Sequence, residues 1–216
     1  MSIDIEAFRQ RWVDRWPGHR PGDHWWFDRT MKASLFFSSL PQSKGDAESA
    51  VEFAESLHRH HETLVELLEV SSQPKDTQLI LVTRSWSNTS EPVSRDPWLD
   101  RLVPAVYFDS FTQDPPGETD DDPAWAHVYL TESNSADGSL ASLLLLVAGE
   151  QTAMTAITTP SMEWLYEPWR NGGSIWGISD DAASELRERH GDWLPVERPL
   201  PGQPVDRDIP GWEFVT

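Results

Sequence analysis

The chain has 216 residues and a mass of 24.6 kDa, which is enough for a hydrophobic core of ordinary size. Its longest apolar run, residues 143–148, is far shorter than the roughly 20 residues that a transmembrane helix requires. The chain contains no Cys, which excludes disulfides, thiolate metal sites and thiol nucleophiles. No signal-peptide pattern follows Met1, and we therefore expect a soluble, cytoplasmic protein with no membrane partner.

The negative charge is concentrated in the second half of the chain. Residues 1–108 hold 12 Lys and Arg against 16 Asp and Glu, whereas residues 109–216 hold 5 against 20. Positions 102–169 contain 11 carboxylates and no basic residue, a balance that opposes binding to nucleic acid. The same balance would attract a basic protein, or it would serve solubility alone, and the sequence leaves both interpretations open.

The first elements in chain order are a helix and a strand. Ser2 is placed to cap a helix that Pro17 ends. The apolar stripe of this helix comprises Ile5, Phe8, Trp12 and Trp16. Residues 31–38 include Leu, Phe and Phe in succession, which predicts a strand. A second strand is predicted at 79–83, where β-branched and Leu side chains are typical of a strand buried on both faces.

The longest predicted helix lies between these strands and begins at Asp46. Its predicted buried stripe comprises Val51, Ala54, Leu57, His58, His61, Leu64, Val65 and Leu68. His58, His61 and Glu62 are close enough on one face to share a metal ion, but the second His of a zinc-protease helix is missing. We therefore interpret His58 and His61 as core or boundary side chains, with His60 facing outward, and we predict no metal and no cofactor.

The middle of the chain predicts two strands around an acidic loop. Residues 103–111 and 125–131 have the composition of strands. The loop at 112–124 combines Pro and Gly with a run of carboxylates. Asp137 is then placed to cap a helix over a Leu-rich run, which the sequence pattern favours over a buried strand without excluding the strand.

The last third predicts an antiparallel meander and a final helix. Its three strands are 152–158, 162–167 and 174–178. The turn between the last two contains Asn171, Gly172 and Gly173, which we expect to supply left-handed backbone conformations. Ser179 caps the final helix, and a Pro-rich tail covers 195–216. The whole order predicts one α+β domain over 1–216, a largely antiparallel sheet with helices packed on one face.

The stretch from Met162 to Ile178 reads MEWLYEPWRNGGSIWGI and precedes the predicted final helix and Trp193. In this order of elements the chain resembles an uncharacterised bacterial family, a domain of unknown function, whose members carry a Tyr-Asp-Asp-Arg-Gly hairpin followed by a helix and a Trp. Tyr166 and Arg170 match that hairpin, whereas Glu167 and Pro168 replace its paired acids. The resemblance implies a fold and no established activity.

Tryptophan is unusually frequent, with 12 Trp against 8 Phe and 3 Tyr. Four are expected in the core, namely Trp12, Trp16, Trp164 and Trp193. Others lie near carboxylates, and aromatic anchors surrounded by charge are typical of a protein-binding surface. The first hypothesis is therefore a non-catalytic binding module, similar to an immunity protein, that holds a basic partner. Its candidate binding residues are Asp120, Asp121, Asp122, Trp125, Trp169 and Arg170, although Arg170 would alternatively pair with carboxylates inside the protein.

The second hypothesis is an enzyme with a site near Tyr166, Arg170, Ser174 and His190. Ser174 follows two glycines, and His190 lies downstream as a candidate base. No Gly-x-Ser-x-Gly elbow and no phosphate-binding loop motif occurs, so the sequence favours binding over catalysis. Oligomeric state is not specified by any of these patterns.

Overall fold

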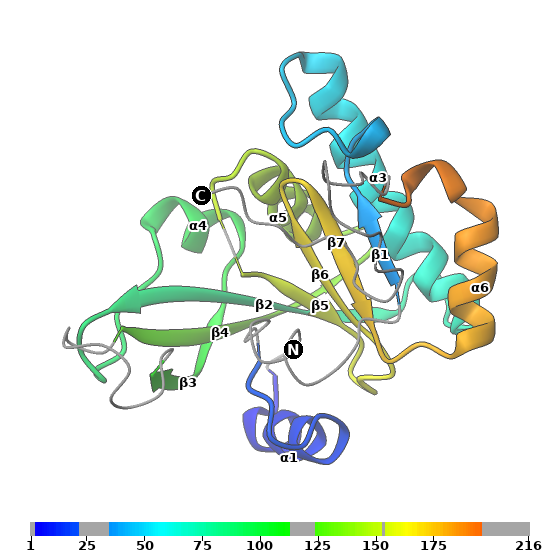
Figure 1. The fold of residues 1–216 in the computed structure, drawn as a ribbon. Coiled ribbons are helices and arrows are strands. Elements are labelled where there is room, and N and C mark those ends of the chain that lie inside the picture. The colour runs from blue at the N-terminus through cyan, green and yellow to red at the C-terminus, as the bar shows by residue number, and fades with distance from the viewer. Residues whose placement is uncertain (1–2, 22–34, 113–123, 153, 196–216) are drawn as a thin grey trace, which may run out of the picture.

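The computed structural model describes residues 3–21, 35–112, 124–152 and 154–195. Its centre is an antiparallel sheet of seven strands in the order β1-β7-β6-β5-β2-β4-β3 (Figure 1). The strands are β1 Leu35–Ser38, β2 Gln78–Ser87, β3 Val106–Thr112, β4 Trp125–Asn134, β5 Ala156–Thr158, β6 Leu165–Trp169 and β7 Gly172–Trp176. The helices are α1 Ile5–Arg15, α3 Ala50–Val70, α4 Pro97–Leu102, α5 Gly138–Ala148 and α6 Asp180–Arg189, with 3₁₀ turns η1 Pro41–Ser43 and η2 Gly191–Trp193. The predicted α+β class is confirmed.

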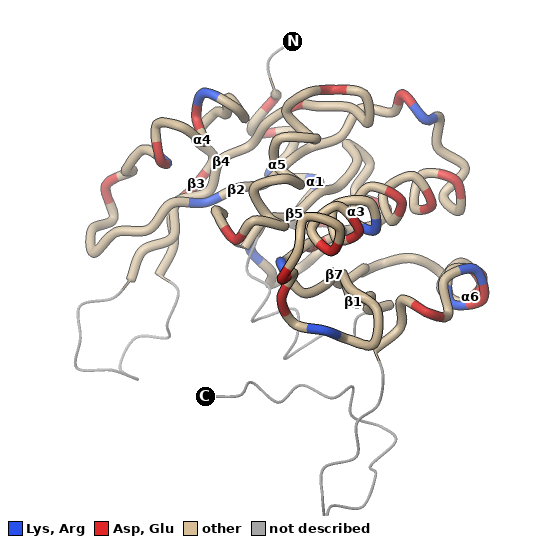
Figure 2. Tube along the Cα trace, turned by 90° about the horizontal axis from the view of Figure 1, so that it is seen from above, with Lys and Arg blue, Asp and Glu red and all other residues tan. Residues whose placement is uncertain are grey.

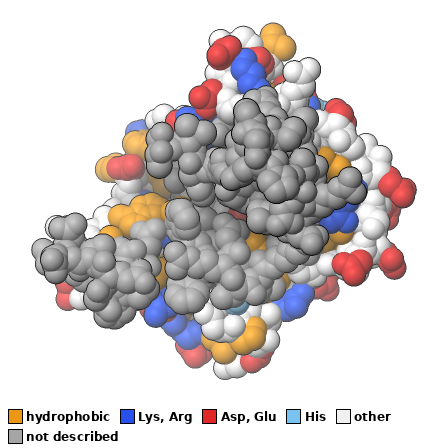
Figure 3. Space-filling view, viewed as in Figure 1, with side chains coloured by type: hydrophobic (Ala, Val, Ile, Leu, Met, Phe, Trp, Pro, Cys, Tyr) orange, Lys and Arg blue, Asp and Glu red, His pale blue; other side chains and the backbone are white. Residues whose placement is uncertain are grey.

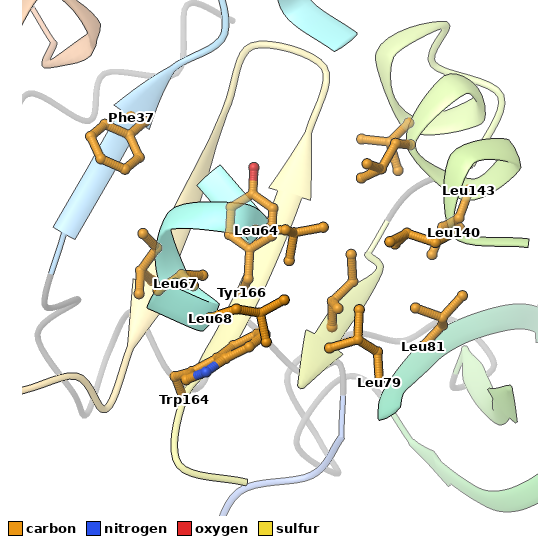
Figure 4. Packing of buried hydrophobic residues seen from close by; sticks show 14 of the residues in the cluster. Phe37, Leu64, Leu67, Leu68, Leu79, Leu81, Leu140, Leu143, Trp164 and Tyr166 are labelled. Atoms are coloured by element: carbon orange, nitrogen blue, oxygen red, sulfur yellow. The ribbon is translucent and has the colours of Figure 1, made fainter. Parts of the chain in front are cut away.

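Alternation along the strands creates one core layer on each side of the sheet. In β2, Leu79 and Leu81 face one side, whereas Ile80 and Val82 face the other. On the first side, leucines of α3 and α5 pack around Trp164 and Tyr166 (Figure 4). Burial of these side chains supplies much of the free energy that stabilises the fold.

The second side of the sheet is covered by α1, which lies opposite α3, α5 and α6 (Figure 1). Phe8, Trp12 and Trp16 form the predicted stripe and are buried against this side. The sequence led us to expect helices on one face of the sheet only, whereas α1 covers the other face. The helix is needed because Ile80 and Val82 make this side of β2 as apolar as the first. The carboxylate of Asp4, rather than Ser2, caps α1 by accepting the N–H of Ala7 at 3.0 Å.

Helix α3 buries a different stripe from the predicted one. It begins at Ala50 with Ser49 as its cap, and Val51 is 80% exposed. His58 and His61 are exposed, whereas His60 is only 2% exposed, which reverses the prediction for all three. The true stripe is half polar and comprises Ser56, Arg59, His60, Thr63, Leu64, Leu67 and Leu68. The apolar pattern was misleading because hydrogen bonds made within the fold permit Arg59, His60 and Thr63 to be buried.

The hairpin of β6 and β7 forms the predicted meander with β5, but its glycines act differently from the prediction. Gly172 and Gly173 lie within β7, and neither has a positive φ. A Cβ atom at Gly172 would lie 2.1 Å from the carbonyl oxygen of Phe37, and one at Gly173 would lie 2.5 Å from the Tyr166 ring. Close approach of neighbouring groups, not the turn, therefore requires glycine at both positions.

Other elements follow the sequence closely. Asp137 caps α5 and Ser179 caps α6, as predicted. The predicted strand at 103–111 begins later, at Val106, because the unpredicted short helix α4 ends at Leu102. Most of the acidic loop and of the Pro-rich tail, residues 113–123 and 196–216, lies outside the described residues. No helix in the described ranges combines the length and the apolar character needed to cross a membrane.

Candidate functional site

Strand β3 forms one edge of the sheet and carries exposed apolar side chains. Among the described strands it pairs only with β4. Val106 and Tyr107 are 42% and 41% exposed, and Leu102 at the end of α4 is also exposed. Hydrophobic side chains reach the surface on the side of the molecule where α4 and the adjoining strands lie (Figure 3). An edge of this kind is typical of a surface to which another strand can be added.

The position of β3 is held by helix α1. The guanidinium of Arg9 donates to Asp109 at 2.8 Å and to the carbonyl oxygen of Phe108 at 3.2 Å. The same cation lies 4.6 Å from the centre of the Phe108 ring. These contacts stand where the register of β3 against β4 shifts, between Tyr107 and Asp109. The bulge of β3 is therefore bonded to α1 on the second side of the sheet. These contacts fix the orientation of the β3 edge.

The candidate acidic residues are attached directly to this edge. Thr112 at the end of β3 pairs with Trp125 at the start of β4, and the chain between them contains five carboxylates and no Lys or Arg. Asp120, Asp121 and Asp122 belong to this segment and lie outside the described residues. Trp125 is half-buried. The connection alone keeps the carboxylates within a short chain length of β3.

Four polar side chains form a hydrogen-bonded chain across β2, β4 and β3, which we name the Ser–His chain. It comprises Ser87, His127, Ser110 and Tyr107. His127 Nε2 lies 2.8 Å from Ser87 Oγ, and His127 Nδ1 lies 2.6 Å from Ser110 Oγ. The Tyr107 hydroxyl lies 2.8 Å from Ser110 Oγ. The imidazole is fully buried, whereas Ser87 and Ser110 on its two sides are both partly exposed, so a buried ring links two partly exposed serines.

The direction of the Ser–His chain follows from the contacts of Ser87. Ser87 Oγ lies 2.9 Å from the carbonyl oxygen of Thr89, which accepts and cannot donate. When Ser87 donates to that oxygen, His127 Nε2 carries the proton and donates to Ser87, and Nδ1 accepts from Ser110. This tautomer satisfies every contact of the chain, including a hydrogen bond donated by Tyr107 to Ser110. Burial lowers the pKa of His127, which favours the neutral ring that this arrangement requires.

A second candidate site is an open cleft of about 850 Å³ beside the first half of α3. It is lined by η1 and the residues after it, by one side of α3 and by Asp192. The buried Arg59 guanidinium donates to Glu55 at 2.7 Å and to the carbonyl oxygen of Ser38 at 3.2 Å. Lys44 contacts both Glu48 and Glu52. Acidic and basic positions thus neighbour each other along α3 (Figure 2), and internal ion pairs neutralise much of the charge of this cleft.

A third polar group, the His60–Tyr166 pair, is sealed inside the first core layer. His60 Nδ1 lies 2.7 Å from the Tyr166 hydroxyl, and the Tyr166 ring is surrounded by leucines (Figure 4). Burial lowers the pKa of His60 to about 4 and raises the pKa of Tyr166 well above its ordinary value. Both groups are therefore neutral at pH 7, and this pair ties α3 to β6 rather than meeting a ligand.

One comparison with known proteins identifies a family. The family model of a domain of unknown function, DUF3885, matches residues 24–197. The chain belongs to this family. The matched range contains the sheet, the Ser–His chain and the cleft beside α3, whereas α1 precedes it. Comparisons with curated proteins and with solved structures give no match. Family membership identifies the domain and assigns no activity to it.

Within this DUF3885 domain, Arg170 makes the internal ion pairs that the sequence left as an alternative. Its guanidinium lies 3.1 Å from Asp46 and also contacts Glu150. Trp169 is half-buried and packs with its ring centre 5.1 Å from that of Phe36. These contacts join the β6–β7 turn to the segment before α3. They place Trp169 and Arg170 in the hairpin of β6 and β7, which is separated from β3 by three strands in the sheet order.

The DUF3885 domain does not gather the residues of the enzymatic hypothesis. Tyr166 points toward α3, whereas Ser174 lies on the opposite side of the sheet because it pairs with Glu167. His190 stacks on Trp193 at 4.0 Å and lies 3.4 Å from Glu66. The described residues include no group of three His, Asp or Glu side chains arranged to hold a metal.

The sequence offered little indication of the Ser–His chain. Ser87, His127 and Ser110 belong to three strands, and no spacing along the chain relates them. The only local indication is that His127 stands between the apolar residues Ala126 and Val128 in a strand that is buried on both faces. The burial of Arg59 was equally difficult to predict from the sequence, because an Arg in an acidic helix typically occupies a solvent-exposed position.

Proposed function

We propose that this DUF3885 domain is a protein-binding module that pairs its edge strand β3 with a strand of a basic partner protein. The observation that carries the proposal is the exposed β3 edge. Val106 and Tyr107 offer apolar contact there, and the outer backbone groups of β3 face no other described strand. Strand addition uses main-chain hydrogen bonds for affinity and alternate side chains for specificity.

Charge selects the class of partner. The segment 113–123 adds five carboxylates and no cation next to β3, whereas described carboxylates elsewhere, such as Asp109 and Glu55, are paired with Arg. An excess of negative charge in the sequence, as in this segment, accelerates encounter with a basic protein and repels nucleic acid. The module would then mask its partner in the manner of an immunity protein.

The test uses the basic protein that the full-length chain captures from its native host and measures binding kinetics with purified components. Replacing Asp120, Asp121 and Asp122 by Asn should slow association about tenfold at low salt, because electrostatic steering is removed. The effect should fade near 0.15 M salt, where the screening length is about 8 Å. The free energy of unfolding should stay almost unchanged, because exposed charges contribute little to stability.

The strand-pairing part of the proposal is tested separately with Val106→Lys. A Lys on an edge strand opposes strand addition, so the variant should dissociate faster. Leu145→Lys is the matched control, because Leu145 is similarly exposed but lies on helix α5 and not on the edge strand. Amide exchange in β3 should slow when the partner binds. Equal on-rates for the Asn variant, or unchanged exchange in β3, would overturn the proposal and leave the acidity as an aid to solubility.

A further inference from the structure

Ser110 lies between a buried imidazole and the outer edge of the sheet. Its Oγ is 2.6 Å from His127 Nδ1, and its residue is partly exposed. This is the order in which a nucleophile and its general base are arranged in hydrolytic sites, with the base behind and the hydroxyl in front. We infer that Ser110 is a nucleophilic serine that His127 activates toward the carbonyl carbon of carboxylic esters.

The hydrogen bonds of the Ser–His chain give each member a role. Ser110 donates to the unprotonated Nδ1, so its proton has an acceptor at the moment of attack. Ser87 accepts from Nε2 and thereby holds the ring in that tautomer, which makes it a positioning residue. The Tyr107 hydroxyl, 2.8 Å from Ser110 Oγ, is near enough to donate to an oxyanion that forms on a carbonyl group beside Oγ.

Structural support alone accounts poorly for this chain. Strand β2 pairs with β4 over ten residues, and β3 pairs with β4 over six, so the strands are held by their backbones. Burying an imidazole is unfavourable, and its hydrogen bonds offset that cost with little net gain. Apolar side chains would hold the same strands without it. The same cost applies to His60, whose partner Tyr166 is sealed in the core, whereas His127 bonds to a partly exposed hydroxyl, which is the arrangement that reactivity requires.

The reaction balances with the residues of the chain and water. Ser110 Oγ attacks the ester carbonyl carbon, its proton passes to His127 Nδ1, and the carbonyl oxygen becomes an oxyanion. Collapse of this intermediate breaks the bond to the alcohol, which leaves with the proton from Nδ1, and Ser110 is acylated. A water molecule then attacks the acyl carbon and gives its proton to His127. Release of the carboxylic acid returns that proton to Ser110 Oγ.

The absence of a carboxylate contact at His127 Nε2 shapes the expected kinetics. In the described residues the partner of Nε2 is a serine, which stabilises an imidazolium less than a carboxylate does. We therefore expect slow turnover with an initial burst of released alcohol. The inference goes beyond strand pairing, and its test needs no protein partner, so each proposal can fail without the other.

The first experiment treats the full-length chain with a fluorophosphonate probe and locates the modified residue by peptide mass spectrometry. In this reaction Ser110 Oγ attacks phosphorus, the P–F bond breaks, fluoride leaves and the hydroxyl proton passes to His127. Ser110 should be the labelled residue, and Ser110→Ala should abolish the label. Ser85→Ala is the matched control, because Ser85 is a partly buried serine of β2 that donates to the carbonyl oxygen of Val93 instead.

A positioning role and a catalytic role are separated by further variants. His127→Gln should reduce the labelling rate at least a hundredfold, and Ser87→Ala about tenfold with the thermal unfolding temperature nearly unchanged. The rate should be half-maximal below pH 6.5, because burial lowers the pKa of His127. Labelling of Ser110 no faster than that of Ser85, or a rate indifferent to Ser87→Ala and to pH, would overturn the inference. If His127→Gln fails to fold, Ser87→Ala and the pH profile decide.

Discussion

Two buried histidines of this protein form hydrogen bonds of nearly the same length to hydroxyl groups. They differ in the solvent exposure of the residue that carries the hydroxyl. His60 Nδ1 is 2.7 Å from the Tyr166 hydroxyl, and His127 Nδ1 is 2.6 Å from Ser110 Oγ. Tyr166 is sealed by leucines in the middle of the sheet, whereas Ser110 stands on an edge strand beside the exposed Tyr107. Hydrogen-bond geometry is therefore a poor guide to role, and access to the hydroxyl separates a structural pair from a candidate reactive one.

The two environments also differ in how they respond to a change in volume. The Tyr166 ring fills a space that is limited by Gly173, so any added atom displaces it. Around Ser110 the chain ends at the surface, and substitutions there meet solvent on one side. The difference predicts a range of effects on stability, from large in the first core layer to small at the β3 edge.

The largest expected effect is that of Gly173→Ala. The new Cβ would lie 2.5 Å from the Tyr166 ring, and the surrounding leucines prevent the ring from moving away. The free energy of unfolding should therefore fall by about 3 kcal/mol. Gly191→Ala is the control, because nothing lies within 4 Å of a Cβ at that position. Urea unfolding measures both. Equal midpoints for the two variants would show that the Tyr166 ring is not confined by its neighbours.

The second prediction concerns pH. The folded-state pKa of His60 is about 4, below the unfolded value of 6.5, so the unfolded chain binds the extra proton between these values. The stability that comes from burying His60 in its neutral form is fully present above pH 6.5 and is lost as the pH falls toward 4. The free energy of unfolding should therefore fall by about 2 kcal/mol between pH 7 and pH 5. His60→Gln should remove that slope, whereas His58→Gln should keep it, because His58 is exposed on the same helix. Chemical unfolding at several pH values provides the measurement.

The third prediction compares the stability lost when the hydroxyl of Tyr166 or of Ser110 is removed, and it includes the smallest expected effect. Tyr166→Phe leaves buried His60 without its partner and should lower the free energy of unfolding by about 2 kcal/mol. Ser110→Ala leaves a position that water can reach and should lower it by less than about 1 kcal/mol. Thermal and urea unfolding of both variants test this. If Ser110→Ala is as destabilising as Tyr166→Phe, the Ser–His chain is a structural device like the pair in the core.

Patterns local in the chain were predicted well because they depend on neighbouring residues. Asp137 and Ser179 cap their helices, since a cap needs only a side-chain oxygen and the N–H groups of the next turn. The meander of β5, β6 and β7 followed from short connections between apolar runs. The resemblance to an uncharacterised family rested on the same segment, and a match to the DUF3885 family was found.

Where the sequence misled, long-range contacts decided the outcome. The stripe of α3 was assigned by apolarity, yet Arg59 and His60 are buried because Ser38 and Tyr166, distant in the chain, accept or share their hydrogen bonds. Gly172 and Gly173 were assigned to a turn, yet they are required by Phe37 and Tyr166. Polar burial depends on a partner, and a partner from another strand leaves no spacing to recognise.

The sequence by itself determined the α+β class, the caps of α5 and α6, most strands and the uneven distribution of charge, because propensity and periodicity act over a few residues. Only the tertiary structure decided which strand is the edge and which hydroxyl meets which imidazole. Strand order brings Ser87, Ser110 and His127 together from three separate strands, and it places Ser174 on the side of the sheet away from Tyr166. A candidate site assembled across a sheet is a property of register, which backbone pairing over the whole sheet sets.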